Sequence, residues 1–261
     1  MPKLTTYEDN PFQAELQSRY ENHRANRNAQ QATQTWHQTS QAGISTQGIY
    51  QSSNCLVVWA RPTSLVRDLI KFVQNELSSV TPYLWLIPAE NLHIKVLEIA
   101  YSFTEDQIDS LIVVYSFSYR TRLIKPIVSF DSVAIALSFV PTAGKASDAR
   151  QSTAEDVYSY HHLCQDIFDI VQAAGTPLAS RWLSQEGTGL GKSAVDPVKT
   201  KQLTDKIEDI NQKLQAEYWP NQNEVNGHGE WLVGQEKGLV IRRGRLWYSG
   251  GEDVQVGLGY A

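Results

Sequence analysis

A histidine and a lysine stand two residues apart in an apolar segment of this 261-residue chain. The segment from Pro88 to Ile99 alternates in a way that predicts a strand, with His93 and Lys95 on the same face. Two neighbouring polar groups on a strand seldom enter a core without partners. A lysine beside a histidine would attract an anion such as phosphate, and it would lower the imidazole pKa and favour the neutral base. The pair therefore indicates a candidate anion-binding site, although a lone histidine in an apolar strand is more often a satisfied core or cleft residue.

The elements that would position this pair are predicted from apolar periodicity and from turn and capping residues. Residues 1–53 are strongly polar and predict a solvated helical arm, starting at Asn10-Pro11, and a linker. Residues 54–147 form a predicted first lobe that carries the His93 strand, and residues 148–261 form a second lobe. The first lobe is expected to contain further strands at Cys55–Ala60, Pro126–Phe130 and Val133–Val140, and helices that begin at Pro62-Thr63-Ser64 and at Thr104. The second lobe is expected to contain helices over about 155–174 and from about Pro197 to Tyr218, then hairpins of Trp231–Val233, Leu239–Ile241 and Arg245–Tyr248.

Strands that alternate with helices and end in antiparallel strands are typical of an α+β domain, here of two similar lobes. The loop Pro141–Arg150 is rich in alanine, glycine and serine and is the expected boundary between the lobes. We expect His93 and Lys95 to project into a central cleft between them.

Composition narrows the class of partner. The formal net charge of -5 argues against a broad nucleic-acid surface, which needs a basic face. The longest apolar stretches are far too short to span a bilayer, so no membrane partner is expected. Two cysteines are too few for a disulfide framework and fit a reducing compartment. We expect a cytoplasmic monomer.

Several longer segments carry a resemblance to a known family. They are Asn54–Pro62, Leu84-Trp85-Leu86, Ala134–Pro141, Tyr160–Leu163, Gly229–Leu239 and Leu246-Trp247-Tyr248. Together with the His93 strand, they resemble a mostly fungal family described as RNA ligase/cyclic nucleotide phosphodiesterase-like, within the 2H phosphoesterase superfamily. The resemblance runs from about Asn10 to Gly259.

This resemblance implies two lobes about a pseudo-twofold axis, each giving one His-x-Thr motif to a shared cleft. It implies hydrolysis of a cyclic phosphodiester, such as a cyclic nucleotide or an RNA end, as the small phosphorylated partner. It implies no cofactor and no metal. His93 would be the first catalytic histidine, and Lys95, which replaces the expected threonine, would bind phosphate.

The second motif is not found. A strand reading roughly Pro-Ser-Ala-His-x-Thr should follow Ala179–Trp182, but the chain continues from Leu183 to Gly189 without it. Either Glu186-Gly187-Thr188 is a decayed motif, or about a dozen residues are missing after Trp182; the second reading is favoured because nothing from Leu183 to Ser193 has the pattern of a buried strand. The second lobe is therefore expected to lack a strand.

One histidine supplies only half of a two-histidine acid–base apparatus, in which each group contributes about 10²–10⁴-fold. We expect a 2H phosphoesterase-like protein whose hydrolytic activity is impaired or lost, a candidate pseudoenzyme. The alternatives are a non-catalytic module that binds a nucleotide or another anion, and a cleft recruited for other small-molecule chemistry.

Three further groups of residues have weaker claims to chemistry. Glu186–Ser193 ends in Gly-Lys-Ser, but Glu186 stands where a P-loop needs glycine, so a surface loop is favoured. His161 with Cys164, and His162 with Asp166, have the spacing of metal ligands on a helix, but no second ligand cluster accompanies them. Arg242, Arg243 and Arg245 flank a predicted turn and are most simply solvated charges, with phosphate contact as the alternative.

Overall fold

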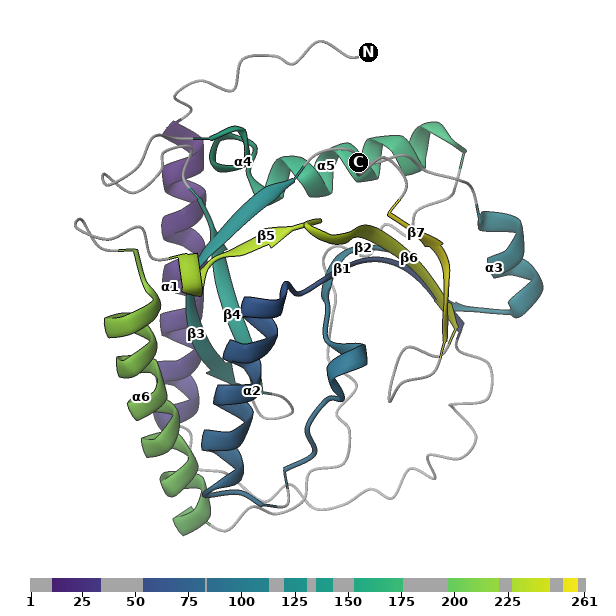
Figure 1. Ribbon diagram of the computed structural model, residues 1–261. Coiled ribbons are helices and arrows are strands. Elements are labelled where there is room, and N and C mark those ends of the chain that lie inside the picture. The colour runs from purple at the N-terminus through teal and green to yellow at the C-terminus, as the bar shows by residue number, and fades with distance from the viewer. Residues whose placement is uncertain are drawn as a thin grey trace.

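The computed structural model describes residues 11–33, 54–82, 84–112, 120–130, 135–142, 153–175, 197–220, 227–244 and 251–257. These residues form a mixed α+β structure with two antiparallel sheets, which confirms the predicted α+β class (Figure 1). The segment from Leu183 to Ser193, with its two candidate motifs, lies outside the described residues. No helix in the described part of the chain is long and apolar enough to cross a bilayer.

The first sheet, sheet A, holds β2 but not His93: the strand expected over Pro88–Ile99 begins only at Ile94, because Ala89–Asn91 form a 3-10 turn and His93 immediately precedes the strand. Its strands lie in the order β2-β1-β6-β7, and every neighbouring pair is antiparallel. Its strands are β1 (Asn54–Arg61), β2 (Ile94–Phe103), β6 (Glu236–Gly244) and β7 (Glu252–Val256). The central strand β1 was predicted from its apolar run, whereas β7 was not predicted.

The second sheet, sheet B, has the order β4-β3-β5 and is also antiparallel. Its strands are β3 (Thr121–Phe130), β4 (Ile135–Pro141) and β5 (Trp231–Val233). Each sheet takes strands from both sides of the predicted lobe boundary, so neither sheet is formed by one predicted lobe alone. The expected hairpin between β5 and β6 is wrong, because the turn at Gly234 carries the chain from sheet B to sheet A.

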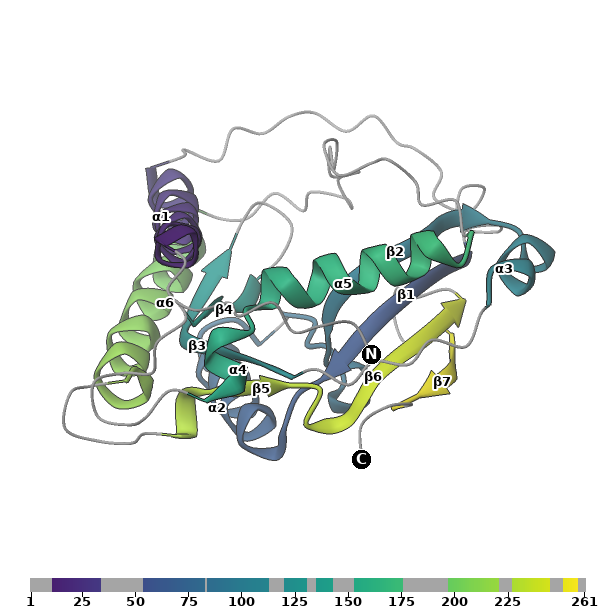
Figure 2. The same cartoon turned by 90° about the horizontal axis from the view of Figure 1, so that it is seen from above.

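Six α-helices and two 3-10 turns accompany the sheets in the described residues. They are α1 (Pro11–Thr33), α2 (Ser64–Ser78), η1 (Ala89–Asn91), α3 (Glu105–Leu111), α4 (Ala154–Val157), α5 (Tyr160–Ala173), α6 (Pro197–Tyr218) and η2 (Gly227–Gly229). Helix α5 lies across sheet A, while α1 and α6 run beside sheet B (Figure 2).

Side chains alternate along a strand, so sheet A presents different residues on its two faces. Leu56, Val58 and Ala60 point toward α5, where they form the main core with Leu163 and Ile167. The opposite face carries Cys55, Val57, Trp59 and Val240, and we call it the Trp59 face. This face positions the candidate site.

Local capping explains where the helices start. Helix α2 begins after Thr63, whose hydroxyl accepts a hydrogen bond from the Val66 amide. Thr104 and Gln107 form the predicted capping box at the start of α3. Within α2, Val66 is fully buried whereas Leu65 is 45% exposed.

Two helical predictions need correction. The expected helix over 155–174 is two helices, because Tyr158 and Ser159 have extended backbone between α4 and α5. Helix α1 is not solvated along its whole length, since Arg24 is only 6% exposed and donates hydrogen bonds to the carbonyls of Lys125 (2.7 Å) and Ser138 (3.2 Å).

Helix α6 supplies side chains to one edge of β3. Strand β5 pairs only with residues Thr121–Leu123, so the rest of that edge has no strand beside it in the described structure. The Asn211 side chain accepts a hydrogen bond from the Val128 amide (2.6 Å) and donates one to the Val128 carbonyl (2.9 Å). Trp219 Nε1 donates to the Pro126 carbonyl at 2.9 Å. Side chains of a helix thus replace the missing strand.

A buried ionic network connects the start of β3 to α4 and to the residue before β5. Arg122 Nε donates to Asp156 (3.0 Å) and its Nη1 donates to Glu230 (2.6 Å). Asp156 is fully buried and also accepts hydrogen bonds from the Thr153 amide and hydroxyl. Each of these hydrogen bonds runs from a donor to a carboxylate oxygen, which is how a buried negative charge is stabilised.

Candidate anion-binding site

The site is organised around the indole of Trp59. Trp59 lies near the end of β1 and is 2% exposed. The His93 ring stacks on it, with ring centroids 3.5 Å apart and planes inclined by 8°. Lys95 lies opposite Trp59 in the β1–β2 register, and directly opposed residues of an antiparallel pair share a face. The structure therefore brings His93 and Lys95, the two residues selected from the sequence, to the Trp59 face.

A hydrogen bond fixes the tautomer of His93. Its Nδ1–H donates to the carbonyl of Asn91 at 2.7 Å, so in the neutral ring the lone pair is on Nε2. Nε2 forms no hydrogen bond with any described residue. Burial, together with the charges of Arg61, Lys95 and Arg242, lowers the pKa of His93 to about 4. His93 is therefore neutral at pH 7, with Nε2 able to accept a proton or a hydrogen bond.

Two arginines complete the surroundings of Trp59. Arg61 ends β1, and its guanidinium carbon lies 5.5 Å from the indole centroid. Arg242 lies opposite Val57 in the β1–β6 register, and its guanidinium carbon lies 5.1 Å from the centroid. Both distances are within the range of cation–π attraction. Strand pairing thus brings cationic residues that are far apart in the chain together around Trp59.

The cluster has fewer carboxylates than cations. Asp253 of β7 accepts hydrogen bonds from both arginines, at 2.6 Å from Arg242 and at 3.2 Å from Arg61. Lys95 forms an ion pair with Glu98. Three cations facing two carboxylates leave one positive charge in excess on this part of the Trp59 face. An anion would be attracted to it.

Some residues of the site and its neighbour Asn91 have buried donors without partners. Trp59 Nε1, Asn91 Nδ2 and Arg242 Nε are buried, and none of them has a hydrogen-bond partner among the described residues. Buried polar atoms in native proteins nearly always have partners, so these donors indicate incomplete polar contacts. The arrangement can hold an oxyanion near the arginines, with a neutral histidine beside it. As a base at pH 7, a histidine with a pKa of about 4 is weak.

Sequence reasoning found part of this cluster. His93 and Lys95 were selected by spacing, and Arg242 was named only as an alternative for phosphate contact. Trp59, Arg61 and Asp253 were not selected. Their signal is weak in a single sequence, because β1, β2, β6 and β7 come together only in the folded sheet.

The remaining candidates have other surroundings. His162 Nδ1 accepts a hydrogen bond from the Ser159 amide (3.2 Å) at the start of α5, and Asp166 accepts one from the Tyr158 hydroxyl (2.6 Å). No group of three or more histidine, cysteine or acidic side chains with metal-binding geometry occurs in the described ranges. Arg243 forms ion pairs with Asp109 and Glu252, and Arg245 lies outside the described residues.

Comparison with known proteins adds no family assignment: no protein-family model matches this chain, and no curated protein matches it.

Proposed function

We propose that this chain is a 2H phosphoesterase-like protein that binds a small phosphate ester on the Trp59 face and hydrolyses it slowly or not at all. The supporting observation is the neutral His93 ring stacked on Trp59 beside Arg61, Lys95 and Arg242. The ligand class is a cyclic nucleotide or an RNA end. In such a fold, sheets A and B, rather than residues 54–147 and 148–261, would be the two lobes.

Weak hydrolysis follows from the acid–base groups. A phosphodiester hydrolysed by two histidines needs one to activate water and one to protonate the leaving oxygen. Within the described residues, the other histidines are His23 on α1, His161 and His162 on α5, and His228 in η2, which are not the strands that carry the Trp59 face. The low pKa of His93 further reduces its strength as a base.

A purely binding role is the second candidate. It is favoured because the cations of the site lie close to His93 while its pKa of about 4 limits proton transfer at pH 7. The two roles differ only in turnover. For either role we propose a cytoplasmic location, since two cysteines are too few for a disulfide framework and fit a reducing compartment.

The test uses calorimetric titration of the whole chain with 2′,3′-cyclic AMP, together with chromatographic detection of nucleoside monophosphate. We expect saturable binding that Lys95→Ala weakens about threefold to tenfold, as for loss of a charge-assisted contact. Lys201→Ala is the matched control, because Lys201 is an exposed lysine paired with Asp205 on α6.

The outcomes separate the readings. Binding without turnover supports the binding module, and slow turnover that His93→Gln abolishes supports the impaired enzyme. Rapid turnover lost in His93→Gln would refute the impairment, and no saturable binding would refute both roles.

A further inference from the structure

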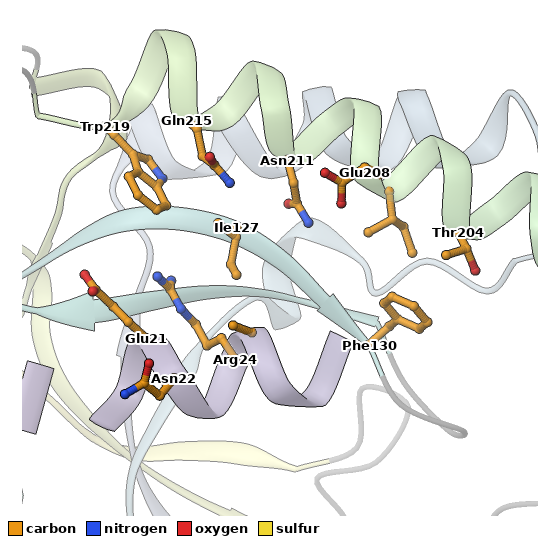
Figure 3. A pocket seen from close by; sticks show the side chains of 12 residues that line it. Glu21, Asn22, Arg24, Ile127, Phe130, Thr204, Glu208, Asn211, Gln215 and Trp219 are labelled. Atoms are coloured by element: carbon orange, nitrogen blue, oxygen red, sulfur yellow. The ribbon is translucent and has the colours of Figure 1, made fainter. Parts of the chain in front are cut away.

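A pocket of about 490 Å³ lies beside sheet B, between α1 and α6. Helix α1 contributes Glu21, Asn22, Arg24 and Ala25 to its lining, and β3 contributes Ile127 and Phe130. The remaining lining residues are Thr204, Ile207, Glu208, Asn211 and Gln215 of α6 and Trp219, which directly follows that helix. Figure 3 shows the α1 and α6 side chains pointing toward each other across the strands. None of these residues lies on the Trp59 face or belongs to the candidate anion-binding site.

Arg24 is the unusual lining residue. It is 6% exposed, and its only hydrogen bonds to described residues run from Nη1 to the carbonyls of Lys125 and Ser138. Its Nε is buried without a partner, and no carboxylate of the described residues lies within ion-pair distance. The Lys125 carbonyl that accepts from Arg24 lies at an irregularity of β3: Lys125 has φ 55°, and the pairing with β4 shifts register there.

A buried guanidinium without a carboxylate is costly, because Nη1 bonds to carbonyl oxygens do not neutralise its charge. Burial lowers the pKa of Arg24 to about 10, against the opposing effect of Glu21. Glu21, whose charge acts on Arg24, is engaged in an ion pair with Lys125 at 2.6 Å. The missing group is therefore a carboxylate or another planar anion that can pair with the guanidinium fork.

The other lining residues restrict the ligand further. Phe130, Ile127, Ile207 and Trp219 offer apolar and aromatic surface for a hydrophobic body. Glu21 and Glu208 also line the pocket, and two carboxylates would repel a dianion more strongly than a monoanion. We propose that this pocket binds a small monocarboxylate with an apolar or aromatic body, and that Arg24 holds its carboxylate.

The test is calorimetric titration of the whole chain with 4-phenylbutyrate, compared with its neutral amide and with 4-phenylbutyl phosphate. We expect saturable binding of the carboxylate at one site. The amide should bind about tenfold more weakly or not at all, because it lacks the charge that pairs with Arg24. The phosphate dianion should also bind more weakly. Binding of the amide or the phosphate as tight as that of the carboxylate would overturn the assignment.

Variants place the ligand. Arg24→Met should weaken 4-phenylbutyrate by about tenfold or more. Arg19→Met is the matched control, since Arg19 is an exposed arginine on the same helix, paired with Glu15. Unchanged affinity in a folded Arg24→Met protein would overturn the proposal.

If Arg24→Met does not fold, an added charge tests the same site without removing a buried group. Gln215 is exposed at the pocket rim, and Gln215→Glu should weaken the carboxylate about threefold through repulsion. Gln202→Glu adds the same charge to α6 away from the pocket lining and should change nothing. Equal effects of these two variants, or no binding by the unaltered chain, would refute the proposal.

Discussion

Arg122 and Arg242 are arginines of similar burial in opposite electrostatic situations. The Arg122 side chain is 16% exposed and forms ion pairs with two carboxylates, Asp156 and Glu230. The Arg242 side chain is 10% exposed and shares a single carboxylate, Asp253, with Arg61. Arg242 also has a buried Nε without a described partner, whereas Arg122 Nε is bound to Asp156.

The difference separates an arginine that stabilises the fold from one that is suited to a ligand. Where carboxylates outnumber the arginine, its positive charge is fully compensated inside the protein and the network ties β3 to α4. Where arginines outnumber the carboxylate, the compensation is incomplete and an external anion can complete it. Removal of each arginine should therefore affect a different measurement.

The largest expected effect is on stability. Arg122→Met would leave the fully buried Asp156 and the largely buried Glu230 without their cation, which should lower the free energy of unfolding by about 3–5 kcal/mol. Arg242→Met should change it by less than about 1 kcal/mol, since Asp253 keeps Arg61. Urea unfolding followed by circular dichroism measures both. Equal losses in the two variants would remove the distinction.

The next effect is a pH dependence that belongs to the Trp59 face. Unfolded histidine has a pKa of about 6.5, and folding lowers that of His93 to about 4. Above pH 6.5 both states are neutral and the full stability is present. As the pH falls from 6.5 to 4, only the unfolded state takes up the proton, so stability should fall by up to about 3 kcal/mol.

His93→Gln should flatten this acid limb when unfolding is measured at several pH values. A smaller loss should remain, because burial also lowers the pKa of His162 on α5. An acid limb of the same depth in the variant and the unaltered chain would show that His93 is not the group responsible.

A third effect concerns binding. Arg242→Met should weaken 2′,3′-cyclic AMP about tenfold, because a charge-assisted hydrogen bond on a buried surface is lost. Arg243→Met is the matched control: Arg243 is the next residue of β6 and is held by Asp109 and Glu252. Titration calorimetry gives both affinities. Similar losses in the two variants would point to a general charge effect rather than a site.

The smallest expected effect has the opposite sign. Asp253→Asn should strengthen binding of the same nucleotide about twofold to fivefold, because it releases both arginines from a competing carboxylate. Glu252→Gln, which removes a neighbouring exposed carboxylate from β7, serves as its control. Weaker binding in Asp253→Asn would mean that Asp253 positions the arginines instead of competing with the ligand.

The sequence predicts the local elements well where one physical signal dominates. The apolar run of β1, the Thr104 capping box and the periodicity of α6 gave elements close to those observed. The break between α4 and α5 was missed because Val157 and Tyr160 continue the apolar pattern across it. Strand β5 was found, but its sheet was not, since pairing partners are set by long-range contacts.

The candidate site is only partly readable from the sequence for the same reason. His93 and Lys95 are close in the chain, so their spacing was informative. Arg61 and Asp253 are 192 residues apart, and no local pattern relates them. Arg24 illustrates the limit most clearly. It lies in a polar helix, yet it is buried and donates hydrogen bonds to carbonyls more than 100 residues away in the chain.

The Asn211 amide has a consequence for the behaviour of this protein in solution. A residue's N–H and C=O point to the same edge of a strand, so at Val128 both would be open to another chain if α6 did not occupy them. The Asn211 side-chain amide thus makes the hydrogen bonds that a neighbouring strand would make, and it blocks the addition of a strand from another molecule at this position. Partial detachment of α6 would expose this edge together with buried Val128 and Phe130, which makes α6 the element that protects the chain from aggregation.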